Sequence, residues 1–203
     1  MCIALLALSA ASARADTYCV NAPGCDATHD KGTDLQAALT AAEGRPGPDD
    51  VVVGGGVYTG TGFHYDSPDA VHIDGAGGRS FGRDGPTLVD TSSGNPSGQT
   101  QLQVLGTSHS TISGIDVVVP GGSGSGNTGI ETTGRIDDVL VQSDDPASTD
   151  ATGVRLDDGA VMANTDVLLG RRSPLGDGVA IAGAGVSMLD SRIDASQGVV
   201  TAT

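Results

Sequence analysis

Histidine and aspartate occur together in two short stretches of the N-terminal half, His64-Tyr65-Asp66 and His72-Ile73-Asp74. Imidazole and carboxylate groups are common in binding and catalytic sites because they titrate and form strong hydrogen bonds. Tyr58, Phe63 and Tyr65 place most of the few aromatic residues in the same region. We therefore consider His64, Asp66, His72 and Asp74 a candidate ligand patch. The alternative is ordinary surface histidines beside packing aromatics.

Five aspartates gather in two consecutive turns of the C-terminal half: Asp144, Asp145, Asp150, Asp157 and Asp158. Carboxylate oxygens are the ligands that calcium prefers, so these residues form a candidate calcium site and make calcium the one cofactor that the sequence suggests. Acidic turns without metal are the alternative on so acidic a chain. The run Gly121–Gly126 imitates a calcium-binding repeat but has Gly126 where that repeat needs aspartate, which favours a flexible loop.

A complete catalytic set is not recognisable in the sequence. Glycoside hydrolysis needs two carboxylates at a defined separation, and lyase chemistry needs a base with a cation, arginine or lysine to stabilise the enolate. The chain also has no complete nucleotide-binding glycine motif and no nucleophile elbow. Catalytic residues therefore remain unassigned at this level.

The elements that must position these residues are indicated by a repeat. Segments that begin at Gly129, Gly153, Gly178 and Gly198 share one pattern, with spacings of 24, 25 and 20 residues. A second apolar pattern, first seen at Ile112–Val119, returns in phase between them. Repeats of this length with two short alternating strands per period predict stacked β coils. The 32 glycines and the 2% of aromatic residues suit narrow coils with small side chains inside.

Alternation within the repeat assigns the two faces of each strand. Two inward ladders are expected, one of Ile130, Val154, Val179 and Val199 and one of Thr132, Leu156, Ile181 and Thr201. Glu131 and Arg155 then become outward neighbours on adjacent coils, about 4.8 Å apart. Asp166 and Arg192 are expected to be neighbours in the same way.

A single convincing helix precedes the coils. Thr33-Asp34-Leu35-Gln36 has the pattern of a capping box. Apolar residues recur at helical spacing at Leu35, Ala38, Leu39 and Ala42, and Gly44 is placed to end the helix. We expect this helix to cover the open apolar end of the first coil.

The start of the chain resembles a known group of proteins. The order of Leu35-Gln36-Ala37-Ala38, Asp50-Val51-Val52-Val53 and Gly56-Val57-Tyr58 resembles the start of secreted right-handed parallel β-helix proteins, the pectate-lyase-like superfamily. Ser110-Thr111-Ile112-Ser113-Gly114-Ile115 resembles its coil signature. The resemblance covers residues 33–203 and implies an all-β, right-handed parallel β-helix with an N-terminal capping α-helix. It selects no activity, because the superfamily contains lyases, hydrolases, epimerases, adhesins and phage proteins.

One triplet, Asn164-Thr165-Asp166, resembles the first motif of polygalacturonase-like hydrolases. That family has paired aspartates, Gly-His-Gly and Arg-Ile-Lys in later coils, and none of these follows the triplet here. The pair Asp157-Asp158 precedes it instead. The triplet is therefore interpreted as a structural position in a strand.

The N-terminus indicates export. Ile3–Ala11 is a short apolar run, and Ala13-Arg14-Ala15 has the small residues of a cleavage site, so residues 1–15 are predicted to be a signal peptide. Its removal leaves Cys19 and Cys25 in an oxidising compartment, where we expect a disulfide. Free thiols, or half of a metal site with His29, are the alternatives.

The charge excludes some partners. With 25 acidic and 10 basic residues, the chain has a formal net charge of −15 at pH 7. Such a surface repels phosphate, so we expect no nucleic acid and no anionic membrane as partner. After the signal peptide, no segment is apolar enough to span a membrane. A polyanionic substrate is disfavoured unless cations bridge it to the protein.

Together these patterns predict a parallel β-helix domain at residues 16–203, truncated at its C-terminal end because the strand at 198–203 lacks a cap. An uncapped coil would favour edge-to-edge self-association. The expected function is an extracellular or cell-surface scaffold, adhesion or carbohydrate-binding module, with a polysaccharide or cell-surface ligand as partner. The alternative is a polysaccharide lyase or glycoside hydrolase whose active coils lie partly outside this chain.

Overall fold

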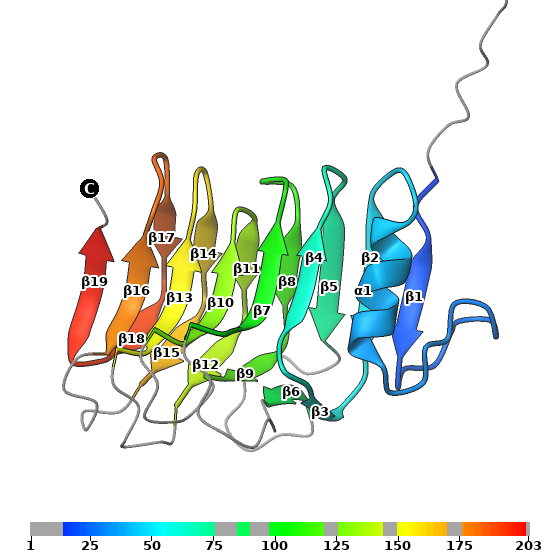
Figure 1. The fold of residues 1–203 in the computed structure, drawn as a ribbon, viewed down its shortest axis with the longest axis horizontal. Helices are drawn as coiled ribbons and strands as arrows, with labels where there is room; N and C mark the ends of the chain where they lie inside the picture. The colour runs from blue at the N-terminus through cyan, green and yellow to red at the C-terminus, as the bar shows by residue number, and fades with distance from the viewer. Residues whose placement is uncertain are drawn as a thin grey trace, which may run out of the picture.

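Three parallel sheets form a right-handed β-helix in the computed structural model, as the sequence predicts. The structure describes residues 14–75, 85–89, 98–119, 126–143, 150–169 and 176–201. From β2 onward the chain visits sheets A, B and C in turn, so that equivalent strands stack along the long axis (Figure 1). Neighbouring strands in the stack pair in parallel, for example β10 with β13 and β11 with β14.

The strands are short. Sheet A contains β1 (Thr17–Val20), β2 (Asp49–Val53), β5 (Val71–Gly75), β8 (Thr111–Ser113), β11 (Arg135–Asp137), β14 (Val161–Ala163) and β17 (Ser187–Leu189). Sheet B contains β3 (Gly56–Thr59), β6 (Pro86–Val89), β9 (Asp116–Val118), β12 (Leu140–Gln142), β15 (Asp166–Leu168) and β18 (Arg192–Asp194). Sheet C contains β4 (Phe63–Asp66), β7 (Thr100–Leu105), β10 (Thr128–Thr132), β13 (Thr152–Leu156), β16 (Asp177–Ile181) and β19 (Gln197–Thr201).

Each regular coil has three strands, so the prediction of two strands per period was wrong. The apolar run Ile112–Val119 is divided by a bend at Gly114, whose φ is +62°. Asp138, Asn164 and Asp190 occupy the same corner in later coils, with φ of +54°, +45° and +45°. Glycine, asparagine and aspartate are the residues that adopt this left-handed conformation at least cost. A stack of such residues therefore turns each coil from sheet A into sheet B.

This corner supports a prediction about Asn164, whose Nδ2 also donates to Asp137 Oδ1 at 2.9 Å. Asn164→Gly keeps the left-handed backbone and loses only this exposed hydrogen bond, whereas Asn164→Val also forces a β-branched residue into the corner. We expect the valine variant to be less stable than the glycine variant by about 1 kcal/mol. Urea unfolding of both variants measures the difference, and equal stabilities would show that the corner tolerates any residue.

The predicted inward ladders are confirmed in β10 and β13 and at Val179 of β16, whereas Ile181 is half-buried and Thr201 is exposed. Ile130, Val154 and Val179 are opposite one another in β10, β13 and β16, and all three are fully buried. Thr132 and Leu156 form the second ladder and are also fully buried. In the edge strand β19, Val199 continues the register but is 44% exposed. Burial of these side chains is the main stabilising contribution, at about 25 cal/mol per Å².

Helix α1 (Leu35–Glu43) covers the edge of sheet C at the N-terminal end of the stack (Figure 1). Its four buried residues are the predicted Leu35, Ala38, Leu39 and Ala42. The N-cap is Asp34, whose side chain accepts from the Ala37 amide, so the predicted capping box was placed one residue too early. The side chains of Gln36 and Glu43 instead accept hydrogen bonds from the backbone amides of β4, which would otherwise be an open edge.

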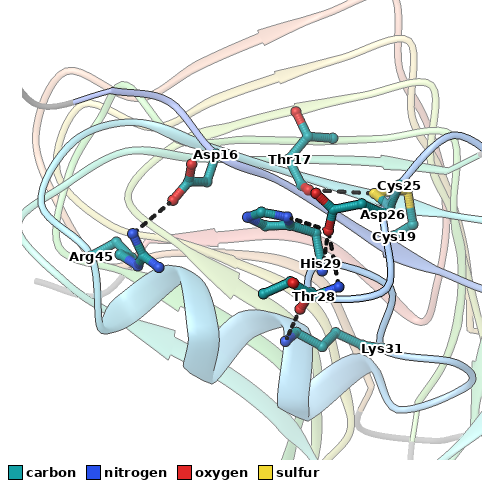
Figure 2. A network of polar contacts seen from close by, with 9 residues as sticks. All are labelled: Asp16, Thr17, Cys19, Cys25, Asp26, Thr28, His29, Lys31 and Arg45. Carbon is teal, nitrogen blue, oxygen red and sulfur yellow. Dashed lines mark hydrogen bonds and ion pairs between the residues drawn. A yellow bond between two sulfur atoms is a disulfide. The ribbon is translucent and has the colours of Figure 1, made fainter.

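Cys19 and Cys25 form the predicted disulfide, which rules out free thiols or a metal site at these positions. His29 does not join them in a metal site, because its ring nitrogen lies 2.8 Å from Asp26 Oδ1 (Figure 2). The bridge closes the loop that follows β1. Residues 1–13 of the predicted signal peptide are outside the described residues.

Candidate functional site

The outer face of sheet C carries a row of polar side chains that we call the sheet C ladder: His64, Gln103, Glu131 and Arg155. Register places them opposite one another in β4, β7, β10 and β13. They are the residues between the inward positions, so alternation points them outward. Ala180 and Val200 continue the same row in β16 and β19 without a polar group. The ladder therefore occupies the four strands of sheet C nearest to the helix.

Glu131 connects the ladder. Its Oε2 accepts a hydrogen bond from Gln103 Nε2 at 2.8 Å, and its Oε1 lies 3.4 Å from Arg155 Nε. The Glu131 side chain is only 14% exposed, so these contacts fix it against the sheet. Arg155 Nε also lies 3.6 Å from Asp157 Oδ1. The predicted Glu131–Arg155 pair is thus confirmed and belongs to a larger network with two carboxylates and one guanidinium.

A groove of about 540 Å³ lies at the end of this ladder. Its lining residues come from α1, from β4 and the loop before it, and from β7 and the segment before it: Gln36, Thr61, Gly62, Phe63, His64, Gly98, Thr100 and Gln103. Gln36 is held in place by two hydrogen bonds to the His64 backbone, at 2.9 and 3.1 Å. Amide, hydroxyl and imidazole groups dominate the polar lining. The groove can therefore offer both hydrogen-bond donors and acceptors to a neutral ligand.

The four residues of the predicted ligand patch lie on two different sheets. His64 and Asp66 belong to β4 in sheet C, whereas His72 and Asp74 belong to β5 in sheet A. His72 Nδ1 lies 2.9 Å from Thr111 Oγ1, and Asp74 Oδ1 accepts from Ser113 Oγ at 3.0 Å, both on the next coil. The chain turns from one sheet to the next between the two pairs. Only His64 of the four lines the groove.

The predicted calcium ligands are only partly described, because Asp144 and Asp145 lie outside the described residues. Asp150 precedes β13 and Asp157 follows it, so the length of that strand separates them. Asp158 Oδ1 accepts from the Ala184 amide on the next coil at 2.8 Å. Within the described ranges, no three His, Cys, Asp or Glu side chains come together as a metal site. Of the glycine-rich run 121–126, only Gly126 is described.

The triplet Asn164-Thr165-Asp166 lies at a corner. Asn164 has the left-handed backbone described above, and Thr165 is buried with its hydroxyl donating to the Ala163 carbonyl. Asp166 begins β15 and is opposite Arg192, as predicted, and Arg192 also lies 3.6 Å from Asp194. The positions of Asn164 and Thr165 follow from the geometry of the coil.

Two partly buried carboxyl groups give a prediction about pH. Burial raises the pKa of Asp157, and burial together with the charge of Asp150 raises the pKa of Asp177, from an ordinary value of 3.8. The folded protein therefore binds more protons than the unfolded chain in the interval just above pH 3.8. Because of these two groups, stability should fall as pH rises through that interval.

Asp177→Asn should therefore be more stable than the parent protein at pH 7 and should have a flatter stability profile above pH 3.8. Denaturant unfolding between pH 3 and pH 7 measures both effects. Asp190→Asn, at an exposed corner, is the matched control and should leave the profile unchanged. A loss of stability in Asp177→Asn at pH 7 would contradict the assignment.

None of the helices in the described part of the chain is long and apolar enough to cross a membrane. Comparison of the chain with models of protein families, with curated proteins and with solved structures finds no match.

Sequence reasoning did not find Gln36, Thr100 and Gln103 as functional candidates. The sequence pattern places Gln36 in the capping box, which gives its side chain a role only at the start of the helix. Gln103 lies between the apolar residues Leu102 and Val104 of β7, and extending the register of the repeat backward would have placed it opposite Glu131. The alternation of that strand was therefore the signal that could have identified it.

Proposed function

We propose that this chain is an extracellular or cell-surface β-helix scaffold whose groove on sheet C binds carbohydrate. The proposal includes membership of the pectate-lyase-like superfamily, which the parallel coils and the capping helix support. The observation that carries it is the groove of about 540 Å³ with Gln36, His64 and Gln103 at its wall, next to the sheet C ladder. Export agrees with the disulfide between Cys19 and Cys25.

The ligand class follows from charge and geometry. The polar groups of the groove are amides, hydroxyls and one imidazole, which suit the hydroxyls of a sugar. Stacked strands present polar groups at intervals of about 4.8 Å, which suits a polymer lying along the stack. A formal net charge of −15 opposes an anionic polymer, so a neutral polysaccharide is the expected ligand.

A second function rests on a specific observation, the two carboxylates at Arg155. Burial raises the pKa of Asp157, and Glu131 Oε1 and Asp157 Oδ1 both lie close to the same nitrogen, Arg155 Nε. An acid and a carboxylate across a substrate are the parts of a glycoside hydrolase. In this alternative the sheet C ladder would be catalytic, with further active coils outside this chain.

A panel of neutral and acidic polysaccharides, each with and without calcium, distinguishes the two functions. Binding is measured by affinity electrophoresis, and turnover is measured as unsaturated products or new reducing ends. The scaffold function predicts binding of neutral polymers without turnover. Turnover that Asp157→Ala or Glu131→Ala abolishes would contradict it and support the enzyme.

A further inference from the structure

Asp49, the first residue of β2, is fully buried, and only one of its two carboxylate oxygens accepts a hydrogen bond. Its Oδ1 accepts a hydrogen bond from the Asp16 amide at 2.8 Å. Its Oδ2 is buried and has no hydrogen-bond partner in the described part of the chain. An unpaired buried carboxylate oxygen is costly and calls for an explanation.

The charges around Asp49 are also out of balance. Burial raises the pKa of Asp49 and the carboxylates of Asp16 and Asp50 raise it further, whereas the hydrogen bond from the Asp16 amide and the charge of Arg45 lower it. Arg45 NH1 lies 3.5 Å from Asp16 Oδ2, as Figure 2 shows beside the end of α1. Two carboxylates thus oppose the charge of Asp49, and the one guanidinium that favours it is already paired with Asp16. One additional positive charge, placed within reach of Asp49 Oδ2, would balance the site better.

The hydrogen-bonded ladder of the sheet begins at Asp16. Its carbonyl accepts from the Asp50 amide at 2.9 Å, and Thr17 is opposite Asp50 in the register of β1 and β2. Arg14 and Ala15, immediately before it, are both exposed. The cleavage site expected from the sequence lies between Ala15 and Asp16. The nitrogen next to the buried carboxylate is therefore the one that cleavage would release.

We propose that Asp16 is the first residue of the mature protein and that its α-ammonium group pairs with the buried carboxylate of Asp49. Hydrolysis of the Ala15–Asp16 bond by an export-associated endopeptidase consumes one water. The C–N bond breaks, Ala15 leaves as a carboxylate, and Asp16 keeps the amine, which takes up a proton at neutral pH.

An α-ammonium carries three N–H donors in place of one amide donor, together with a full positive charge. It can donate to both Oδ1 and Oδ2 of Asp49 from the place where the amide nitrogen already lies. The pair joins β1 to β2 beneath the helical cap, next to the Arg45–Asp16 ion pair. Removal of the signal peptide thereby completes the N-terminal end of the β-helix.

Export of the full chain from a secreting bacterium tests the cleavage. N-terminal sequencing and intact mass of the exported protein should show Asp16 as the first residue. A product that keeps Ala15, or that begins at any other residue, overturns this half of the proposal.

Three proteins with defined N-termini test the ion pair: one that begins at Asp16 with a free amine, the same protein acetylated on that amine, and one that begins at Arg14. At pH 7 the free-amine form should unfold about 5 °C above the other two. Equal unfolding temperatures of the free-amine and acetylated forms would overturn the pairing. In the Asp49→Asn background all three forms should unfold together.

A pH series provides the second readout if Asp49→Asn does not fold. The pairing raises the pKa of the amine above its ordinary value of about 7.7–8.0. Its stabilisation is therefore complete below that value and is lost as pH rises through the raised pKa. Asp16, Tyr18, Asp50, Arg45 and Tyr65 are the charged or titratable groups near the pair, and all three proteins share them. An advantage of the free-amine form that does not decline at high pH contradicts the proposal.

Discussion

Gly153→Ala should lower the free energy of unfolding by about 2 kcal/mol, because the coils approach too closely there for a side chain. A Cβ at Gly153 would collide with Val167 Cγ1 and would lie 2.7 Å from the Gly178 carbonyl oxygen. Gly129 has the same surroundings, because a Cβ there would lie 2.6 Å from the Gly153 carbonyl oxygen. The glycines that begin the first three repeats, Gly129, Gly153 and Gly178, thus allow the coils to approach one another closely.

Gly198→Ala is the matched control for this prediction. Gly198 occupies the same position of the repeat in β19, but a Cβ there would have no atom within 4 Å. We expect this variant to be neutral or slightly more stable, because alanine reduces the freedom of the unfolded chain. Urea unfolding of both variants gives the comparison. Equal effects at the two positions would show that glycine is not required by packing.

Loss of the disulfide should have the second large effect. The Cys19→Ala, Cys25→Ala double variant should lose about 2 kcal/mol, the value expected for a short loop from the constraint on the unfolded chain. The bridge closes a sequence separation of 6 residues, and Cys19 is part of β1. Chemical denaturation at pH 7 measures the change.

Reduction provides the control for the disulfide. A reducing agent should destabilise the parent protein by a similar amount and leave the double variant unchanged. If reduction has no effect on the parent protein, the bridge does not stabilise the fold.

The repeat was predictable because alternation over four copies leaves one register in which the shared apolar positions face inward. Ile130, Val154 and Val179 were placed correctly for this reason. The third sheet was not predicted because Gly114 bends the backbone within a segment that is apolar on both sides of the bend. Ile115 is buried just after the bend, so the run from Ile112 onward resembles one strand.

The candidate site was harder to predict because the repeat is broken near it. Gln101 in β7 occupies the position that Gly129 holds in β10, so the glycine that marks each later repeat is absent. Its side chain is fully buried, and neither of its polar atoms has a hydrogen-bond partner in the described structure. The contribution of Gln36 depends on contact between the helix and β4, residues that are 28 positions apart. The sequence pattern of the helix alone therefore does not predict that contact.

The most direct test of the proposed function is the affinity of Gln103→Ala for the neutral polysaccharide that the parent protein binds. Isothermal titration should show binding weakened about tenfold, because an amide is removed from the groove wall. His72→Ala, on the outer face of sheet A, should bind like the parent protein. Unchanged affinity in Gln103→Ala, or a loss only in His72→Ala, would show that the groove on sheet C is not the binding site.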